Sequence, residues 1–243
     1  MAWRDKTLSV VLPTYNERDS IAECIRRFSS IPEVDEVIVV NNNAAAGTSA
    51  EVATTAAREV FEPTQGYGAA IRRGLREADT DLVAVCEPDG TFNPEDLRKL
   101  LAFIPECEFV VGSRTVATFI WDGANMGWFL RWGNWAVAKL VEVLYNTSSL
   151  SDVGCTFRVM TREHARQVLA HSRLDGSAHG LEMLLLSAIL PTKMVQVPVN
   201  YHPRVGVSSV TGHFLRTIEL GLDMVSQVLR MRARRGRIRR QLG

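Results

Sequence analysis

The 243-residue sequence lacks the features that define several classes of protein. No stretch reaches the ~18 uninterrupted apolar residues that a membrane-spanning helix requires. The N-terminus has no hydrophobic segment of the kind found in signal peptides. The four cysteines lie far apart and form no C-x-x-C pair, which argues against a structural zinc site and indicates a reducing compartment. These absences lead us to expect a cytoplasmic protein.

A net positive charge is confined to one segment. The whole chain has a formal charge of +1, yet seven arginines fall between Arg230 and Arg240, so the remaining residues sum to about −6 (+1 less +7). The chain has no nucleic-acid-binding motif and its main body is acidic, so we expect no nucleic-acid partner. The glycine-rich residues 65–68 are followed by no Gly-Lys-Ser/Thr and lack a third glycine, which excludes a Walker loop and a dinucleotide fingerprint.

An acidic turn that follows a short apolar run is the most informative stretch. Leu82–Cys86 is predicted to be a buried strand, and Glu87-Pro88-Asp89-Gly90 places two carboxylates at its carboxyl end. Ligands of open α/β sheets lie outside these strand ends. Two acids one residue apart can share a divalent cation and, through it, a diphosphate. A solvated loop is the alternative interpretation.

Strands and helices alternate along the first half of the chain. Apolar runs predict strands at residues 8–12, 36–40, 60–61, 82–86 and 109–114. Helical spacing and helix-start signals predict helices at residues 20–29, 48–58, 69–78 and from Asn93 onward. This rhythm predicts an α/β fold with a mostly parallel twisted sheet and helices on both faces. We expect one domain over residues 1–212, with halves 1–115 and 116–212, and then an amphipathic helix and arginine-rich tail over 213–243.

Polar groups follow the other predicted strands as well. Tyr15, after the first strand, is expected to stack on a nucleotide base. Asn41 or Asn42, after the second strand, is expected to hydrogen-bond the edge of that base. Gly66 would let the backbone approach a ligand closely. The first half of the chain is therefore expected to bind a nucleotide.

Several of these segments resemble, in sequence and in order, the family 2 glycosyltransferases of the GT-A fold. The resemblance lies in residues 11–17 (VLPTYNE), residues 39–48 (VVNNNAAAGT) and the acidic turn. The dolichyl-phosphate mannose synthase and polyprenyl-phosphate glycosyltransferase branch is resembled by residues 111–114 (VGSR), 151–158 (SDVGCTFR), Glu182 and 204–208 (RVGVS). The resemblance covers roughly residues 6–210. It implies an inverting, metal-dependent transfer of a hexose from a GDP- or UDP-linked sugar to a polyprenyl or dolichyl phosphate.

The resemblance also implies roles for individual residues. Together with the strand-end residues, the expected nucleotide-sugar site comprises Pro13, Tyr15, Glu17, Asn41, Asn42, Gly66, Glu87, Pro88, Asp89, Thr91 and Arg204. The catalytic candidates are Asp89, Arg114, Arg131 and Glu182. Glu87 and Asp89 would hold Mg²⁺ or Mn²⁺, and Arg204 would face the diphosphate of the donor. Arg114 and Arg131 would hold the phosphate of the acceptor.

The chain departs from the family pattern at three places on the donor side. Residues 41–46, Asn-Asn-Asn-Ala-Ala-Ala, replace Asp-Asp-Asn-Ser-x-Asp, so a base-contacting carboxylate is lost and the recognised base is left open. Glu87 replaces the usual aspartate, which keeps the charge and extends its reach by one methylene group. Ser209 stands where a lysine follows Gly-x-Ser in the family, so one cation near the phosphates is lost.

The identity of the acceptor leaves two roles open for Glu182. A phosphate acceptor is ionised at neutral pH and needs arginine clamps, in which case Glu182 would orient Arg114 or Arg131. A glycan or small-molecule hydroxyl acceptor needs a general base, for which Glu182 is the candidate. The loss of acids at residues 41–46 adds a third hypothesis, a catalytically degenerate nucleotide-binding subunit.

Two segments predict contact with a membrane surface. Four of the five tryptophans lie between Phe119 and Trp135, and Trp128, Trp132 and Trp135 share one helical face. This face is expected either to pack on the sheet or to lie at a bilayer interface and present Arg131 to a lipid phosphate. Near the C-terminus an apolar stripe is formed by Phe214, Leu215, Ile218, Leu222, Val225 and Leu229. The arginines after this stripe would be attracted to anionic headgroups. We therefore expect a protein peripheral to the cytoplasmic face of the membrane, with a second copy or a separate membrane subunit as a candidate partner.

Overall fold

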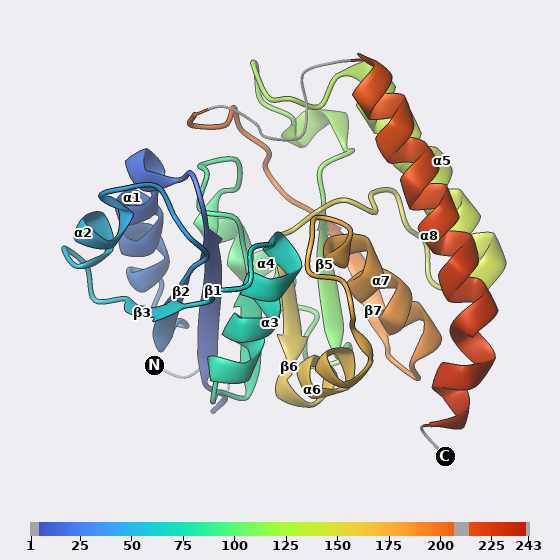
Figure 1. Ribbon diagram of the computed structural model, residues 1–243, viewed down its shortest axis with the longest axis horizontal. Coiled ribbons are helices and arrows are strands. Elements are labelled where there is room, and N and C mark those ends of the chain that lie inside the picture. The colour runs from blue at the N-terminus through green and yellow to red at the C-terminus, as the bar shows by residue number, and fades with distance from the viewer. Residues whose placement is uncertain (1–4, 207–213, 242–243) are drawn as a thin grey trace.

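The computed structural model describes residues 5–206 and 214–241 and, for side chains of the last helix, residues 219–241. In this part of the chain a seven-stranded sheet has the order β3-β2-β1-β4-β6-β5-β7 and is flanked by helices (Figure 1). The strands are β1 (Leu8–Thr14), β2 (Glu36–Asn41), β3 (Arg58–Phe61), β4 (Leu82–Val85), β5 (Phe109–Ser113), β6 (Arg158–Thr161) and β7 (Met194–Pro198). The helices are α1 (Arg18–Ser29), α2 (Thr48–Val52), α3 (Tyr67–Glu77), α4 (Leu97–Leu101), α5 (Trp128–Tyr145), α6 (Arg162–His171), α7 (His179–Ile189) and α8 (Phe214–Arg240). The predicted α/β fold is confirmed.

The sheet is parallel except around β6, which runs antiparallel to both of its neighbours. β1 lies between β2 and β4, where Val10 pairs with both Val37 and Ala84. The carboxyl ends of β1, β2 and β4 therefore meet at one edge of the sheet, where open α/β folds bind ligands. The prediction of a mostly parallel sheet is confirmed.

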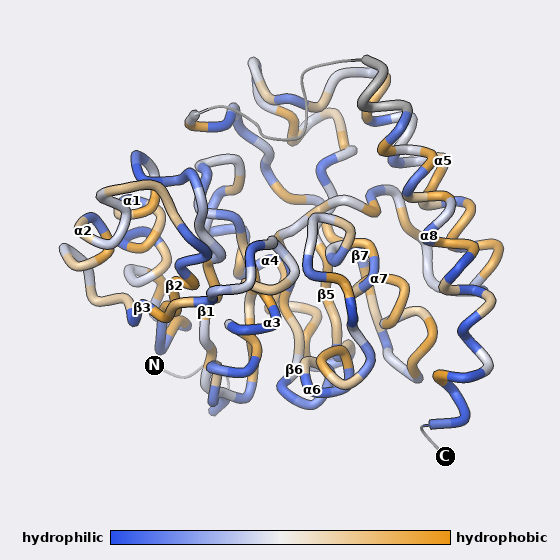
Figure 2. Tube along the Cα trace, in the orientation of Figure 1, coloured by the Kyte–Doolittle hydropathy of each residue, from blue (hydrophilic) through white to orange (hydrophobic). Residues whose placement is uncertain are grey.

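The central strands are apolar because both faces of the sheet are covered. All seven residues of β1 and all four residues of β4 are buried. In α1 the residues Ile21, Cys24, Ile25 and Phe28 are buried, which is the helical spacing seen in the sequence. α3 packs on β1 and β2, and α6 and α7 pack beside α3. Figure 2 shows hydrophobic residues concentrated in the interior strands and hydrophilic residues along the outer loops.

Two predicted helices differ from the structure. α2 ends at Val52, and β3 begins at Arg58, whose guanidinium pairs with Glu36 (2.7 Å) and Glu77 (2.9 Å). The segment after the acidic turn forms a 3₁₀ turn at residues 94–96 and then the short helix α4. The ion pairs of Arg58 join residues far apart in the chain, so local helical spacing did not reveal where the strand begins.

α5 and α8 lie side by side in a helical layer beyond the β7 end of the sheet (Figure 1). The Tyr145 hydroxyl, at the end of α5, donates a hydrogen bond to the main-chain oxygen of Val228 (2.7 Å). Val228, Met231 and Ile238 are buried. The C-terminal helix therefore docks on the protein itself along much of its length.

The apolar stripe predicted for the C-terminal helix is only partly used in this docking. Phe214, Leu215 and Ile218 lie outside the side chains that the structure describes. Leu222 and Leu229 are 66% and 52% exposed, so these two residues face away from the core. Within residues 5–206 and 214–241, no helix combines the length and hydropathy needed to cross a bilayer.

Candidate functional site

The acidic turn lies directly after β4, at the edge of the sheet where β1 and β2 also end. Asp89 is 1% exposed, and its Oδ1 atom accepts hydrogen bonds from the main-chain nitrogen (2.9 Å) and the hydroxyl (2.6 Å) of Thr91. The Ser20 hydroxyl of α1 donates to the main-chain oxygen of Pro88 (2.6 Å). Thr91 therefore orients Asp89, and α1 anchors the turn.

Arg204 supplies a positive charge directly at the two carboxylates. Its Nη2 atom lies 2.5 Å from Asp89 Oδ2 and 3.1 Å from Glu87 Oε2. The main-chain nitrogen of Val205 donates to the main-chain oxygen of Asp89 (2.9 Å), which holds this segment against the turn. With both acids ionised the three side chains keep one net negative charge, so Arg204 compensates the acid pair only in part.

The ionisation of Glu87 is strongly affected by this environment. Burial and the charge of Asp89 raise the pKa of Glu87 from its ordinary 4.5 to about 7, against the opposing effects of Arg204 and Arg114. Its side chain is still 25% exposed, so solvent and ligands can reach the carboxylate. A bound divalent cation would favour the ionised form.

The acid pair fits a hard divalent cation that is shared with a bound diphosphate. Asp89 Oδ2 is buried and, apart from its close ion-pair contact with Arg204, accepts no hydrogen bond. In the described ranges no third acid, histidine or cysteine joins Glu87 and Asp89 to complete a protein cage around an ion. Mg²⁺ commonly uses one or two carboxylates and completes its coordination with substrate phosphates and water. This donor set therefore suits the expected Mg²⁺ or Mn²⁺.

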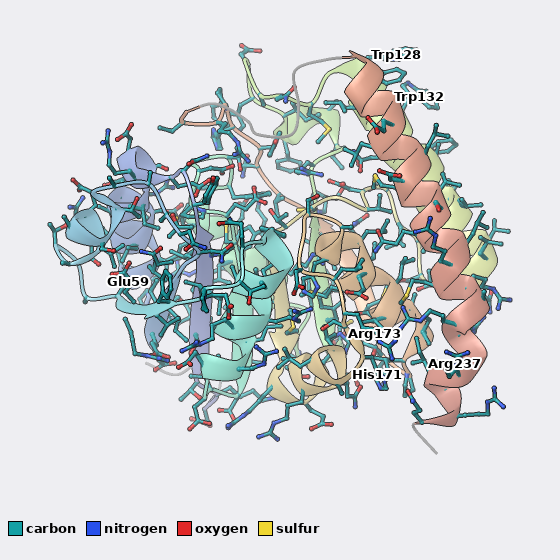
Figure 3. The ribbon with its side chains drawn as sticks, viewed as in Figure 1. Glu59, Trp128, Trp132, His171, Arg173 and Arg237 are labelled. Atoms are coloured by element: carbon teal, nitrogen blue, oxygen red, sulfur yellow. The ribbon has the colours of Figure 1, made fainter. Side chains whose placement is uncertain are left out.

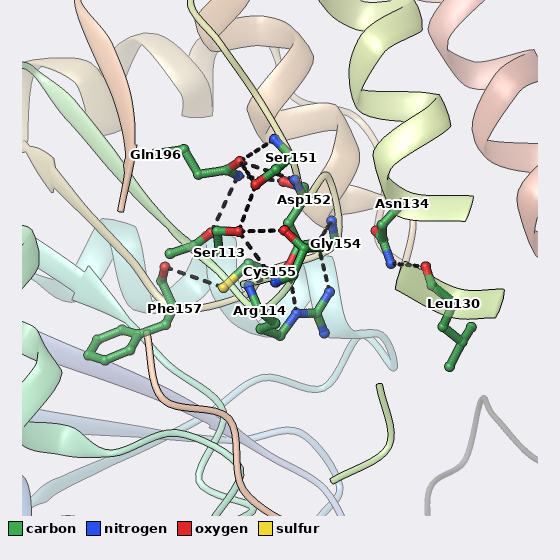
Figure 4. A network of polar contacts seen from close by, with 12 residues as sticks. Ser113, Arg114, Leu130, Asn134, Ser151, Asp152, Gly154, Cys155, Phe157 and Gln196 are labelled. Atoms are coloured by element: carbon green, nitrogen blue, oxygen red, sulfur yellow. Dashed lines mark hydrogen bonds and ion pairs between the residues drawn. The ribbon is translucent and has the colours of Figure 1, made fainter. Parts of the chain in front are cut away.

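A buried ion pair lies near the acidic turn (Figure 4). Arg114 follows β5, and its Nε and Nη2 atoms donate to Asp152 Oδ2 (2.8 Å) and Oδ1 (3.0 Å). Burial alone would lower the pKa of Arg114, but the charge and hydrogen bonds of Asp152 outweigh it and raise the pKa well above its ordinary value. For Asp152, burial raises the pKa, and Arg114 more than offsets this, so the pKa is lowered. Asp152 engages Nε and Nη2 of Arg114, and the ring of Tyr201 lies against the same guanidinium (5.4 Å).

The loop that carries Asp152 is held by a glutamine that the sequence reasoning did not identify. Gln196 Oε1 accepts hydrogen bonds from the main-chain nitrogens of Ser151 (2.6 Å) and Asp152 (3.0 Å), and its Nε2 donates to the main-chain oxygen of Asp152 (2.5 Å) (Figure 4). Gln196 is a polar residue within the strand sequence MVQVP of β7. A polar side chain in an apolar strand was the available signal, but its partners lie more than forty residues away.

Arg131 lies on α5, the helix that passes this loop. One turn further along, Asn134 approaches Gly154 (Figure 4). Ala138 and Val141 are buried further along the helix. Position 131 is at helical spacing from Asn134 and also from the exposed Trp128 and Trp135, so it lies at the border between the buried and exposed sides of the helix. The acceptor-phosphate role of Arg131 stays a prediction.

The segment after β1 is shaped by Glu17. Its Oε2 atom accepts hydrogen bonds from the main-chain nitrogens of Tyr15 (2.7 Å) and Asn16 (2.9 Å) and from the Thr14 hydroxyl (3.2 Å). Tyr15 is 47% exposed, so its ring is accessible for stacking. Pro13 is buried within β1, directly before this segment.

Asn42, one of the two residues expected at the edge of a base, is engaged within the protein. Asn42 is 3% exposed, and its Nδ2 donates to the main-chain oxygens of Glu62 (2.8 Å) and Thr64 (2.7 Å). Its Oδ1 accepts from the main-chain nitrogen of Gly66 (2.8 Å). Asn42 therefore holds the loop after β3, and its amide is fully engaged.

Asn41 belongs to a surface cluster with a carboxylate that the sequence reasoning also overlooked. Asn41 Nδ2 donates to Ser49 Oγ (3.0 Å) and to Glu59 Oε1 (2.9 Å). Glu59 extends from β3 and is exposed (Figure 3). It brings a negative charge next to the position where the family pattern has lost one. The pairing of β2 with β3 brings Asn41 and Glu59 together, and no local sequence motif predicts this contact.

Gly66 and Gly68 serve close packing within the protein. A Cβ atom at Gly66, where φ is +149°, would collide with the main-chain oxygen of Asp175. A Cβ atom at Gly68 would lie 2.5 Å from His179 Cβ and would also meet the Leu174 carbonyl oxygen. Gly66 was expected to let a ligand approach the backbone. In the structure the close approach is instead made within the protein, between the start of α3 and the loop before α7.

Glu182 does not orient either arginine, contrary to one of the expectations. It is 1% exposed, and its carboxylate accepts hydrogen bonds from the main-chain nitrogens of Arg173 (3.1 Å) and Leu174 (2.9 Å). Asp152 takes the place expected for Glu182 beside Arg114. The buried, engaged carboxylate of Glu182 holds the loop before α7.

The packing of Gly68 predicts opposite effects for two glycine-to-alanine changes. Gly68→Ala should lower the free energy of unfolding by about 1–3 kcal/mol, because the new methyl group meets a main-chain oxygen that cannot move freely. Gly133→Ala, in α5, is the matched control. It has no atom within 4 Å of the new Cβ and should raise stability by roughly 0.5–1 kcal/mol. Urea unfolding measures both, and equal effects would contradict the packing role of Gly68.

The raised pKa of Glu87 predicts a pH dependence of stability in the metal-free protein. Native Glu87 keeps its proton up to about pH 7, whereas the unfolded chain releases it near 4.5. The native state binds the extra proton in this window, so the contribution of Glu87 to stability falls as the pH rises through it. Glu87→Gln should therefore gain melting temperature relative to wild type as the pH increases, measured by thermal unfolding in EDTA. A constant difference across the window would contradict this environment for Glu87.

Known proteins resemble the chain over most of its length. An uncharacterised glycosyltransferase of Mycobacterium tuberculosis is 30% identical over 210 residues, which cover 86% of this chain and 91% of that protein. The undecaprenyl-phosphate mannosyltransferase of Micrococcus luteus is 27% identical over 216 residues, covering 83% of this chain and 86% of that protein.

The fold is shared with solved structures of GT-A glycosyltransferases. A crystal structure of glucosyl-3-phosphoglycerate synthase from Mycobacterium tuberculosis, in complex with Mn²⁺, UDP and phosphoglyceric acid, superimposes with a TM-score of 0.67. The similarity covers 96% of this chain and 79% of that one at 21% sequence identity, so it shows the fold alone. The family model described as glycosyl transferase family 2 matches residues 9–169. The chain therefore belongs to the family 2 glycosyltransferases.

Proposed function

We propose that this glycosyltransferase moves a hexose from a GDP- or UDP-linked sugar to a polyprenyl phosphate, with inversion at the anomeric carbon and with Mg²⁺ or Mn²⁺ as cofactor. The observation that carries the proposal is the acid pair Glu87 and Asp89 at the end of β4, in contact with Arg204 and near the Arg114–Asp152 pair. The Micrococcus luteus relative, whose name gives undecaprenyl phosphate as its acceptor, supports the acceptor class.

On the donor side, the acid pair and Arg204 would meet the diphosphate. A divalent cation held by Glu87 and Asp89 would stabilise the charge that develops on the leaving diphosphate. Arg204 would add a second cation at the same place. Tyr15 would stack on the base, and the exposed Glu59 beside Asn41 would accept hydrogen bonds from its edge. UDP is the first nucleotide to test because a protein of the same fold binds it.

On the acceptor side, Arg114 and Arg131 would bind the phosphate. The attacking phosphate oxygen is ionised at neutral pH, so the reaction needs no general base. This oxygen forms a bond to the anomeric carbon while the bond from that carbon to the diphosphate breaks, and the electron pair leaves with the nucleoside diphosphate. Attack from the side opposite the leaving group inverts the configuration. Asp152 would fix the guanidinium of Arg114 for this step.

The exposed aromatic side of α5 supports contact with a bilayer surface. Trp128, Trp132 and Trp135 are 69%, 49% and 44% exposed and contact one another edge to face. Figure 3 shows Trp128 and Trp132 at the outer end of the α5–α8 layer. Tryptophan is favoured at the interface between lipid and water. A bilayer at this end would bring a polyprenyl phosphate to Arg131, which lies between two of these tryptophans in the sequence.

Sugar transfer by matched variants tests the proposed roles. Asp89→Asn should lower kcat/KM by at least about 100-fold, because it removes a charge from the metal site. Arg131→Gln should raise the KM for the acceptor by about tenfold and leave the KM for the donor unchanged, because this residue contacts the acceptor alone. The assay follows labelled sugar from UDP- and GDP-linked donors to a polyprenyl phosphate. Arg98→Gln, at a surface ion pair with Glu33, is the control and should retain activity.

Glu182→Gln distinguishes the competing acceptors in the same assay. The phosphate acceptor predicts that kcat survives this change at temperatures where the variant stays folded. Loss of transfer with intact donor binding would instead support a hydroxyl acceptor with Glu182 as base. Nucleotide binding without turnover on any acceptor would favour the degenerate subunit.

Membrane contact by α5 is tested by sedimentation with vesicles that contain anionic lipids. Replacing Trp128 and Trp132 by serine should weaken vesicle binding by roughly tenfold, because the interfacial aromatic area is lost. Phe61→Ser is the control, since Phe61 is also exposed (54%) but lies on β3. Equal vesicle binding by the tryptophan variant and the control would contradict this orientation.

A further inference from the structure

A cavity of about 350 Å³ lies between the end of α6 and the C-terminal half of α8. Its lining includes His171, Arg173, Arg234, Arg237, Ile238 and Gln241. Figure 3 shows His171, Arg173 and Arg237 near one another, at the end of α8 remote from the labelled tryptophans. None of the lining residues belongs to the acid pair or to the Arg114–Asp152 pair, so the cavity is separate from the site described above.

The positive charge around this cavity is not balanced by acids in its lining. Within the described part of the chain, no aspartate or glutamate lines the cavity. Arg173, Arg234 and Arg237 take part in none of the ion pairs found there. Like charges gathered in this way repel one another, and a bound anion would relieve the repulsion.

Contacts with the folded body hold the walls of this cavity in place. The buried Glu182 carboxylate accepts a hydrogen bond from the main-chain nitrogen of Arg173 (3.1 Å). Ile238 is 3% exposed, and Arg239 Nε donates to the main-chain oxygen of Ile189 (3.3 Å). The arginine-rich segment expected to be a tail is therefore a docked helix, and its side chains line a preformed hollow.

We infer that this cavity binds a compact, multiply charged phosphate group, carried either by a soluble compound or by a lipid headgroup. The guanidinium group presents paired donors whose fork matches two phosphate oxygens, and three such groups line the same hollow. The volume lies within the range of small-molecule sites and accommodates a diphosphate or a phosphorylated sugar. The ligand supplies the negative charge that the lining lacks.

Calorimetric titration of the full chain with inorganic pyrophosphate in EDTA tests this inference, since chelation prevents metal-dependent binding at the acid pair. Wild type should bind, and the double variant Arg173→Gln/Arg237→Gln should bind at least about tenfold more weakly, because charge-assisted contacts are lost. The matched control is Arg230→Gln/Arg232→Gln, which also removes two positive charges, at positions of α8 that do not line the cavity. It should bind pyrophosphate within about twofold of wild type.

Vesicles of phosphatidylcholine, with and without a lipid that carries a phosphomonoester headgroup, separate the two sources of phosphate. Vesicle binding that needs this lipid and is competed by pyrophosphate assigns a headgroup, whereas pyrophosphate binding without vesicle binding assigns a soluble ligand. Two results would overturn the inference. One is the absence of binding to both probes, and the other is equal weakening by the two double variants when their melting temperatures match.

Discussion

Two carboxylates held at the end of a buried strand are the constraint on which the rest of this structure depends. Placing Glu87 beside the buried Asp89 is costly, because burial opposes the ionisation of Glu87 and the two charges repel each other. Thr91 and Arg204 offset part of that cost through a hydrogen bond and an ion pair. A metal ion with its bound diphosphate would offset the remaining cost. The repulsion between the two carboxylates is therefore also what would favour binding of the metal.

Aromatic packing ties this turn to the second half of the chain. Phe157 contacts Phe28 of α1 and Phe92 of the acidic turn, with ring centroids 6.1 and 5.6 Å apart. Phe92 contacts Tyr201 (5.8 Å), and Tyr201 lies under the guanidinium of Arg114 (5.4 Å). Residues on the two sides of the proposed reaction are therefore held by one continuous set of rings. This packing explains how groups distant in sequence keep a fixed spacing without a bound substrate.

The sequence was sufficient for features that rest on local patterns and insufficient for those that rest on long-range contacts. The apolar run Leu82–Cys86 and the turn after it identify a strand and its acids, because burial and turn chemistry act over a few residues. Asn42 shows the opposite case: its spacing suited a base contact, but the loop after β3 folds over it and uses its amide. The ion pair of Arg114 with Asp152 joins residues 38 positions apart, and nothing in either segment favours Asp152 over Glu182.

Metal-dependent nucleotide binding is the central claim, and calorimetric titration of UDP and GDP measures it most directly. We expect one of the two nucleotides to bind with Mn²⁺ or Mg²⁺ present, to lose that binding in EDTA, and to bind more weakly to Glu87→Gln than to wild type. Binding of a nucleotide that persists unchanged in EDTA, or the absence of binding by both nucleotides with metal present, would contradict the assignment of Glu87 and Asp89 as the metal site.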